Sequence, residues 1–183
     1  MPLDVDSLRV RLPQRGIVWL DTAATTMTEA ARLAAAGCPA GTFVIAEEQT
    51  AGLGRHGRGW HSERETGLYV SMVLRPSLEP DSLPVLTLAL GLAVQEAIAC
   101  ATGILCQTAD SAVVAGIGVN VNQQAFPPEL AATATSLRMI SGGPHSREDL
   151  LVELARSVDS YANLLVEQGA DRVLRLYAER ARR

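Results

Sequence analysis

The sequence contains no lysine, and all sixteen of its basic residues are arginine. A Walker A phosphate-binding loop requires a lysine, so the sequence excludes that type of nucleotide site. The formal net charge is −4, which gives no general positive field to attract nucleic acid. We therefore expect no nucleic-acid partner.

Cysteine is also scarce. Cys38, Cys100 and Cys106 are widely spaced and form no CxxC pair, which disfavours a zinc site or a disulfide framework. The histidines are equally scattered, with no ligand spacing: His56, His61 and His145. The sequence thus predicts no metal site and no histidine base, and it favours reduced, buried thiols in a cytoplasmic protein.

Long hydrophobic runs are absent as well. The longest apolar stretch, 83–94, is shorter than the roughly 20 residues that a membrane-spanning helix needs. The first residues have neither the cationic start nor the apolar core of a signal peptide. We expect no membrane association and a cytoplasmic location.

The residues that are present suit one ordinary globular domain, with 48% apolar and 20% charged residues in a chain of 183. Apolar patterning predicts strands at 16–20, 42–46, 68–74, 104–108 and 111–121. It predicts helices at 29–36, 83–101, 146–168 and 171–181. The order lacks a regular βαβ alternation, so we expect an α/β protein of the α+β type, with a mixed sheet packed by helices.

Two local signals refine these elements. Thr26 and Glu29 fit the capping-box pattern at a helix start, and Gly37 is a natural helix stop. Gly116 and Gly118 in the last strand indicate either a β-bulge or a backbone that another group approaches closely.

The densest chemical signal is a glycine–arginine loop within 47–65. Residues 52–57 formally match GxGxxG, but no helix start and no acidic residue follow at the right distance, so we reject a dinucleotide site. Exposed backbone N–H groups and guanidinium forks suit a phosphate or a carboxylate. The composition fits equally well a mobile surface loop whose arginines are only solvated.

The order of residues in this loop resembles a known family. EEQTAGLGRHGRGW, at 47–60, resembles the biotin-binding loop of biotin protein ligases, usually written E-x-Q-x-x-G-R-G-R-x-G-R-x-W. Four further segments resemble that family in the family's order: 21–27 before the first helix, GLYVS at 67–71, GIGVNVN at 116–122 and ATSL at 134–137. Five motifs in order are a far more specific signal than one.

The resemblance implies a fold like that of class II aminoacyl-tRNA synthetases and biotin ligases, with a mixed, largely antiparallel sheet. It implies a ligase that uses ATP and Mg²⁺ to convert biotin to biotinoyl-AMP. The biotinoyl group would then pass to a lysine of a biotin carboxyl carrier protein. It also implies that the chain could form a homodimer.

The resemblance assigns roles to individual residues. It implies that biotin is bound by Thr25, Thr26, Met27, Gln49, Gly52, Leu53, Gly54 and Arg55. It implies that the nucleotide is bound by Arg55, Arg58, Trp60 and Asn120. Arg55 and Arg58 would be catalytic, because they would hold the carboxylate and the α-phosphate while charge builds during adenylation.

Without the resemblance, the same residues have plainer interpretations. Thr25 and Thr26 could serve only as helix caps, and Gln49 could be an ordinary surface residue. Asn120 could complete a turn at a strand end. Trp60 could be a packing residue rather than a stacking platform.

The sequence departs from the family in three places. Leu53 stands where the family usually has arginine. The W-P-N-D and G-x-K-x-x-G-I-L segments are missing, and residues 101–106 join the two sides directly. The small β-barrel that usually follows is also missing, as is the helix-turn-helix of some members. We therefore expect a single, incomplete catalytic domain over 1–183, without a DNA-binding domain.

The missing lysine leaves two functions open. One is an ATP-dependent biotin–carrier ligase, and the other is a catalytically impaired homologue that only binds biotin or its adenylate. Losing a fixed cation beside a developing anion costs on the order of 10²–10³-fold in rate. A lipoate-type ligase is a weaker alternative, because that family lacks the glycine–arginine string.

Overall fold

The computed structural model describes residues 1–54, 57–97, 102–109, 112–180 and 182. Its five strands form one sheet in the order β1-β2-β3-β5-β4. The strands are β1 (Ile17–Ala23), β2 (Phe43–Gln49), β3 (Gly67–Leu74), β4 (Thr102–Ala109) and β5 (Ala112–Asn120). β1 and β2 are parallel and the other pairs are antiparallel, which confirms the mixed, largely antiparallel sheet.

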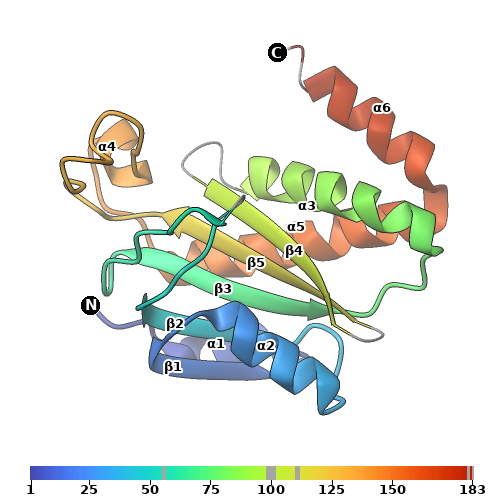
Figure 1. Ribbon diagram of the computed structural model, residues 1–183, viewed down its shortest axis with the longest axis horizontal. Helices are drawn as coiled ribbons and strands as arrows, with labels where there is room; N and C mark the ends of the chain where they lie inside the picture. Colours follow the sequence, from blue (N-terminus) through green and yellow to red (C-terminus); the bar gives the residue numbers. More distant parts are fainter. Residues whose placement is uncertain (55–56, 98–101, 110–111, 181, 183) are drawn as a thin grey trace.

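Helices cover both faces of the sheet (Figure 1). They are α1 (Val5–Arg11), α2 (Thr26–Ala35), α3 (Leu83–Ala97), α4 (Leu137–Ser141), α5 (Arg147–Gln168) and α6 (Ala170–Arg180), with a 3₁₀ turn at Pro80–Ser82. α2 packs on one face and α3 and α5 on the other, so β3 between them is buried along its whole length.

Side-chain alternation explains how β3 contacts both layers. Met72 belongs to the large core beneath α3 and α5, whereas its neighbour Val73 belongs to the smaller cluster beneath α2. Ala30 and Ala34 of α2 lie in that smaller cluster, and their small side chains let the helix pack close to the sheet. All five predicted strands and four predicted helices are therefore present, with shifted ends.

Two predictions at the N-terminal side were wrong or incomplete. Helix α1 was not predicted, yet it is capped by Asp4 and buries Leu8 completely. The capping box at Thr26 was wrong, because Thr25 is the N-cap and accepts from the N–H of Met27 at 3.3 Å. Glu29 forms an ion pair with Arg32 instead of reaching back.

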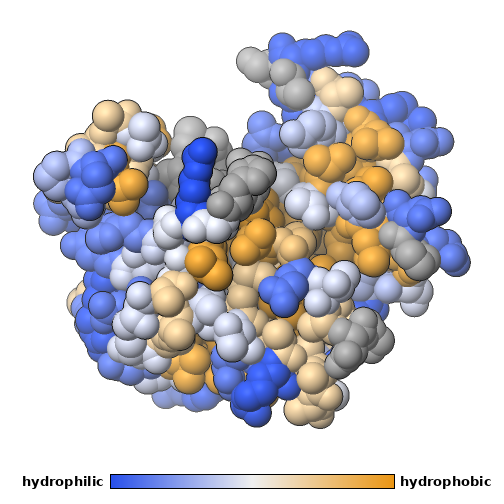
Figure 2. Space-filling model, viewed as in Figure 1, coloured by the Kyte–Doolittle hydropathy of each residue, from blue (hydrophilic) through white to orange (hydrophobic). Residues whose placement is uncertain are grey.

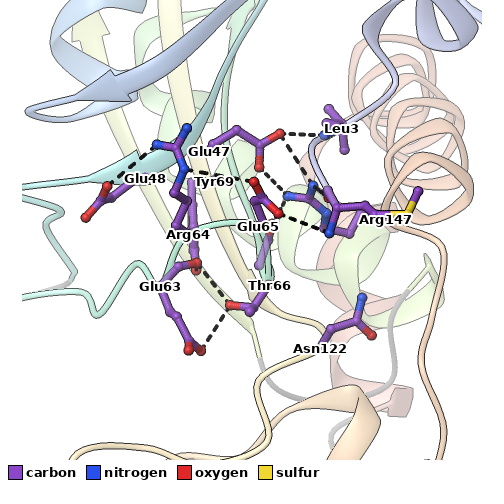
Figure 3. A network of polar contacts seen from close by, with 12 residues as sticks. Leu3, Glu47, Glu48, Glu63, Arg64, Glu65, Thr66, Tyr69, Asn122 and Arg147 are labelled. Carbon is purple, nitrogen blue, oxygen red and sulfur yellow. Dashed lines mark hydrogen bonds and ion pairs between the residues drawn. The ribbon is translucent and has the colours of Figure 1, made fainter.

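A buried ion pair joins α5 to the strand that precedes the glycine–arginine loop (Figure 3). The Nη1 atom of Arg147 lies 2.7 Å from Oε2 of Glu47, and the side chains of Glu47 and Arg147 are 1% and 5% exposed. Arg147 also donates to the carbonyl of Gly67, and the N–H of Leu3 donates to Glu47. This network fixes the end of β2, where Gln49 lies.

The last helix, α6, has both buried and exposed apolar side chains. Val173 of α6 is fully buried, while Leu174 and Tyr177 are 43% and 44% exposed. Figure 2 shows apolar side chains gathered over α3 and α6, at the upper right of the view. Among the described residues, no helix has the length and apolarity needed to cross a membrane.

Candidate active site

A cavity of about 520 Å³ opens between the N-terminal end of α2, strands β3, β4 and β5, and two loops. The loops are 50–66 and 121–136, which lie at the same end of the sheet (Figure 1). The residues predicted from the sequence that line the cavity are Thr25, Thr26, Met27, Gln49, Leu53, Gly54, Arg58, Trp60 and Asn120. Gly52 is buried behind the wall, and Arg55 lies outside the described residues.

Part of the loop 50–66 forms a small hairpin. Leu53 pairs with Gly59, the N–H of Trp60 donates to the carbonyl of Gly52 at 2.8 Å, and the N–H of Gly54 donates to Arg58 at 2.7 Å. The carbonyl of Gly52 and the N–H of Gly54 are therefore paired within the hairpin, although both residues were expected to bind biotin. The hairpin instead fixes the backbone that carries Arg58 and Trp60.

A polar network anchors one end of the cavity. The side-chain oxygen of Gln49 accepts from the N–H of Thr26 at 2.8 Å and from its hydroxyl at 3.2 Å. The Thr26 hydroxyl lies 2.8 Å from that of Ser71, and the Gln49 amide donates to Ser62 at 3.2 Å. Thr26 is 3% exposed and Ser71 is fully buried, so this end is rigid and preorganised.

Paired glycines form a flat wall across β4 and β5. Gly103 pairs with Gly118 in register, and a Cβ atom at either position would lie 2.6–2.7 Å from the indole of Trp60. A Cβ atom at Gly116 would lie 2.7 Å from the sulfur of Met27. The prediction of a closely approached backbone at Gly116 and Gly118 is confirmed, and β5 pairs with β3 without a bulge.

Trp60 packs flat on this wall. Its indole nitrogen is buried and has no hydrogen-bond partner in the described part of the chain. Packing is therefore one role of Trp60, as the residue alone suggested without the family resemblance, and the ring also lines the cavity.

Replacing Gly118 by alanine should displace the Trp60 indole, because the new methyl group would overlap it. Trp19 and Trp60 are the two tryptophans of the sequence, so a Trp19→Phe background reports on Trp60 alone. The emission of Trp60 should shift to the red and become easier to quench with iodide. Gly143→Ala, where a Cβ atom meets nothing within 4 Å, is the matched control. Unchanged emission in Gly118→Ala would rule out this packing.

The ionisable side chains that line the cavity among the described residues are basic. Arg58 and His61 contribute to the wall, and no aspartate or glutamate does so within the described ranges. No group of three or more metal-ligating side chains occurs there either. In a chain of net charge −4, such a cavity favours an anionic ligand.

Arg64, a third arginine of the predicted phosphate-binding loop, lies elsewhere. It pairs with Asp21 and is 3.8 Å from Glu48 (Figure 3). The hydrogen bond from Arg64 lowers the pKa of Asp21. This arginine therefore ties the loop to β1 and β2 and does not face the cavity.

The ATSL segment closes the cavity on the side of β5. The side-chain amide of Asn120 donates to the carbonyl of Thr135 at 3.1 Å, and Thr133 and Ala134 also line the wall. The hydroxyl of Ser136 is buried and donates to the carbonyl of Gln123 at 2.7 Å. Asn120 therefore stabilises the loop, as its plainer interpretation proposed, and lines the cavity as well.

Several lining residues were missed by sequence reasoning. His61 was given no role, and Phe126 and Leu130 fell in a stretch that showed no pattern. His61 could have been found from its position, since it directly follows Trp60 in the recognised string. Nothing local marks Phe126 or Leu130.

Most of the predicted join, residues 101–106, lies on strand β4. This strand begins at Thr102 and pairs with β5 along its length, so Gly103, Ile104 and Leu105 form part of the cavity wall. β4 is the last strand of the sheet in the described part of the chain. Ala101, the first residue of the predicted join, lies outside the described residues.

Comparison with known proteins agrees with this geometry. Residues 19–127 match the Biotin/lipoate A/B protein ligase family. The bifunctional ligase/repressor BirA of Bacillus spizizenii is 34% identical over 162 residues, covering 74% of this chain and 50% of that protein. The biotin–[acetyl-CoA-carboxylase] ligase of Mycobacterium tuberculosis is 34% identical over 189 residues, covering 87% and 70%. The chain thus spans about half the length of BirA.

The structural comparison gives the same result. The biotin protein ligase of Aquifex aeolicus, solved in complex with biotin and ATP, matches with a TM-score of 0.76 and 28% identity. The match covers 85% of this chain and 73% of that one. A biotin protein ligase of Leishmania major matches with a TM-score of 0.74, and at 21% identity it supports the fold alone.

The alignment with the M. tuberculosis ligase also bears on the missing block. It runs over 189 residues, more than the 183 of this whole chain, although it covers only 87% of it. That relative therefore has residues inside the aligned region with no counterpart here. The motif order, the fold and these comparisons together show that the chain belongs to the biotin/lipoate A/B protein ligase family, in which its relatives are biotin protein ligases.

Proposed function

We propose that the cavity binds biotin and ATP and joins them as biotinoyl-AMP. The biotin carboxylate would attack the α-phosphorus of ATP, forming an acyl-phosphate bond while pyrophosphate leaves. The observation that carries this proposal is the convergence of Thr26, Gln49, Arg58, Trp60 and Asn120 on one cavity that has basic and no acidic lining groups among the described residues.

Each group has a task that its position suits. Thr26 and Gln49 form the rigid polar end, which matches the donors and acceptors of an ureido ring. The glycines of β4 and β5 let Trp60 and Met27 lie close against the sheet, and both side chains then line the cavity with apolar surface. Arg58 would hold the carboxylate and the α-phosphate, with Arg55 beside it in the sequence. Asn120 and Trp60 would contact the nucleotide.

The second step would deliver the biotinoyl group to another protein. The lysine amine of a biotin carboxyl carrier protein would attack the acyl carbon, and AMP would leave. Mg²⁺ would arrive with the phosphates of ATP, because the described lining offers no carboxylate to hold it. A cytoplasmic location and a homodimer are part of the same proposal.

One observation favours a second function, binding without efficient turnover. The sequence has no lysine to face the developing anion, and the M. tuberculosis relative has residues with no counterpart in this chain. A cavity of this kind could hold biotin or its adenylate while the chemical step is slow. Both proposals share the same ligand and differ only in rate.

The deciding experiment is biotin-dependent ATP–pyrophosphate exchange, run beside calorimetric titration with biotin. Exchange that requires biotin supports the ligase. Biotin binding without exchange supports the binding protein. The absence of both exchange and binding would contradict the assignment of this cavity to biotin.

A further inference from the structure

The cavity contains a second basic group that the family resemblance does not assign. Of the side chains that line it within the described ranges, Arg58 and His61 are the only ones that can carry a positive charge. Many other arginines of the chain are neutralised by carboxylates, among them Arg15 by Asp159 and Arg32 by Glu29. The two groups in the cavity have no such partner in the described structure.

Packing orients the ring of His61, and its nitrogens are unpaired within the described residues. It meets the ring of Phe126 nearly edge to face, with centroids 6.3 Å apart and planes at 65°. No hydrogen bond joins its nitrogens to any described residue, and the side chain is half-buried at the cavity wall. A ring held by packing, with free nitrogens in a cavity, is available to a ligand.

The lining around His61 contains no acidic side chain among the described residues. Loop 50–66 contributes Arg58 to the lining, whereas β4, β5 and loop 121–136 contribute no charged or titratable side chain that is described. An imidazolium can donate a charge-assisted hydrogen bond to a phosphate or carboxylate oxygen.

We propose that His61 is a ligand-binding residue that donates to the anionic junction between the biotin and AMP moieties. It would supply part of the positive charge that relatives obtain from the lysine absent here. This inference rests on the proposed function, because it assumes an adenylate-like ligand. It adds a residue and a pH dependence that the biotin ligase motif does not contain.

Binding should therefore tighten as the pH falls. A suitable probe is a stable analogue in which biotin is linked to AMP through a phosphodiester, since this group keeps its charge between pH 6 and pH 8. We expect the affinity of the unaltered chain for the analogue to be several-fold higher at pH 6 than at pH 8. The affinity for biotin itself, which binds at the polar end of the cavity, should change little over this pH range.

The test compares His61→Gln and His61→Ala with His145→Gln. His145 lies outside the cavity lining, where its ring bonds Ser141 at 2.7 Å, so it controls for the loss of a histidine. Both His61 variants should bind the analogue about 10-fold more weakly at pH 6 and lose the pH dependence. The control should retain both properties.

Nuclear magnetic resonance of the imidazoles separates binding from a structural effect. The chain has three histidines, so the ring signals can be assigned by substitution. The analogue should move the ring signals of His61 at a fixed pH and leave those of His145 in place. Biotin alone, which lacks the phosphodiester, should move the His61 signals less, whereas an equal effect of both ligands would indicate a merely packed ring.

The outcomes distinguish this inference from the proposed function. Equal affinity and equal pH dependence in the unaltered chain and in His61→Gln would overturn the role of His61 and leave the biotin site standing. Failure of the unaltered chain to bind either biotin or the analogue would overturn both.

Discussion

Replacing Arg147 by methionine should lower the free energy of unfolding at pH 7 by about 3–5 kcal/mol. The guanidinium is the main partner of the Glu47 carboxylate, which is 1% exposed and also accepts from the N–H of Leu3. Removing it leaves a buried charge without its counterion. Urea unfolding followed by circular dichroism measures the change.

The pH dependence of this loss has a defined sign. Burial alone would raise the pKa of Glu47, but hydrogen bonds from Arg147 and Leu3 outweigh burial and hold the pKa below its usual value. The carboxylate therefore stabilises the native chain at neutral pH, and this contribution is lost as the pH falls through the acid range. Without Arg147, burial should dominate, so the variant should approach the unaltered chain as the pH falls.

Two further variants control this experiment. Arg156→Met breaks an exposed pair with Glu153 at 3.6 Å and should cost less than about 1 kcal/mol. Glu47→Gln combined with Arg147→Met should recover part of the loss, because no isolated charge remains. A cost for Arg147→Met as small as that of Arg156→Met, or one that grows in acid, would show that the pair does not stabilise the fold.

Sequence patterns predicted the elements whose cause is local or periodic. β3 shows clear alternation, and α5 has an apolar stripe that becomes its buried face, including Leu151, Leu154 and Val158. Helix α1 has only seven residues and forms through tertiary burial of Leu8, which no local propensity reveals. Patterns therefore predicted the sheet and its large helices but not the short N-terminal helix.

The misplaced helix cap has a similar cause. Thr25 and Thr26 are equally good caps by composition. The choice is made by Ser71 and Gln49, which are distant in the sequence and engage the hydroxyl of Thr26. The position of the helix cap therefore depends on residues that the sheet brings together, and a local motif cannot predict it.

The candidate site divides in the same way. An ordered string of motifs predicted the residues on β2, the hairpin and β5, since these follow one another along the recognised segments. The contact of His61 with Phe126 joins two loops that are far apart in the sequence. Arg64 looked like the other loop arginines, yet the nearby carboxylate of Asp21 holds it outside the cavity. The composition of the loop indicated that it suits an anionic ligand, and the fold determines which of its arginines line the cavity.

Replacing Arg58 by glutamine should slow formation of biotinoyl-AMP by about 10²–10³-fold and should weaken biotin binding much less. Arg58 lines the cavity, and its backbone is fixed by the hydrogen bond from Gly54, so its charge is available where an anion would lie. Negative charge builds on the phosphate during adenylation, and the guanidinium should stabilise that state more than bound biotin. Biotin-dependent pyrophosphate exchange and biotin titration measure the two effects separately.

If exchange in the unaltered chain is too slow to measure, the same role is tested by binding. Arg58→Gln should weaken the phosphodiester analogue about 10–100-fold, and Arg58→Lys, which restores a charge without the planar fork, should recover only part. Arg175→Gln, on exposed α6 away from the cavity, is the matched control. An equal loss of affinity for biotin and for the analogue would contradict a contact between Arg58 and the phosphate, because that contact should weaken the analogue more than biotin.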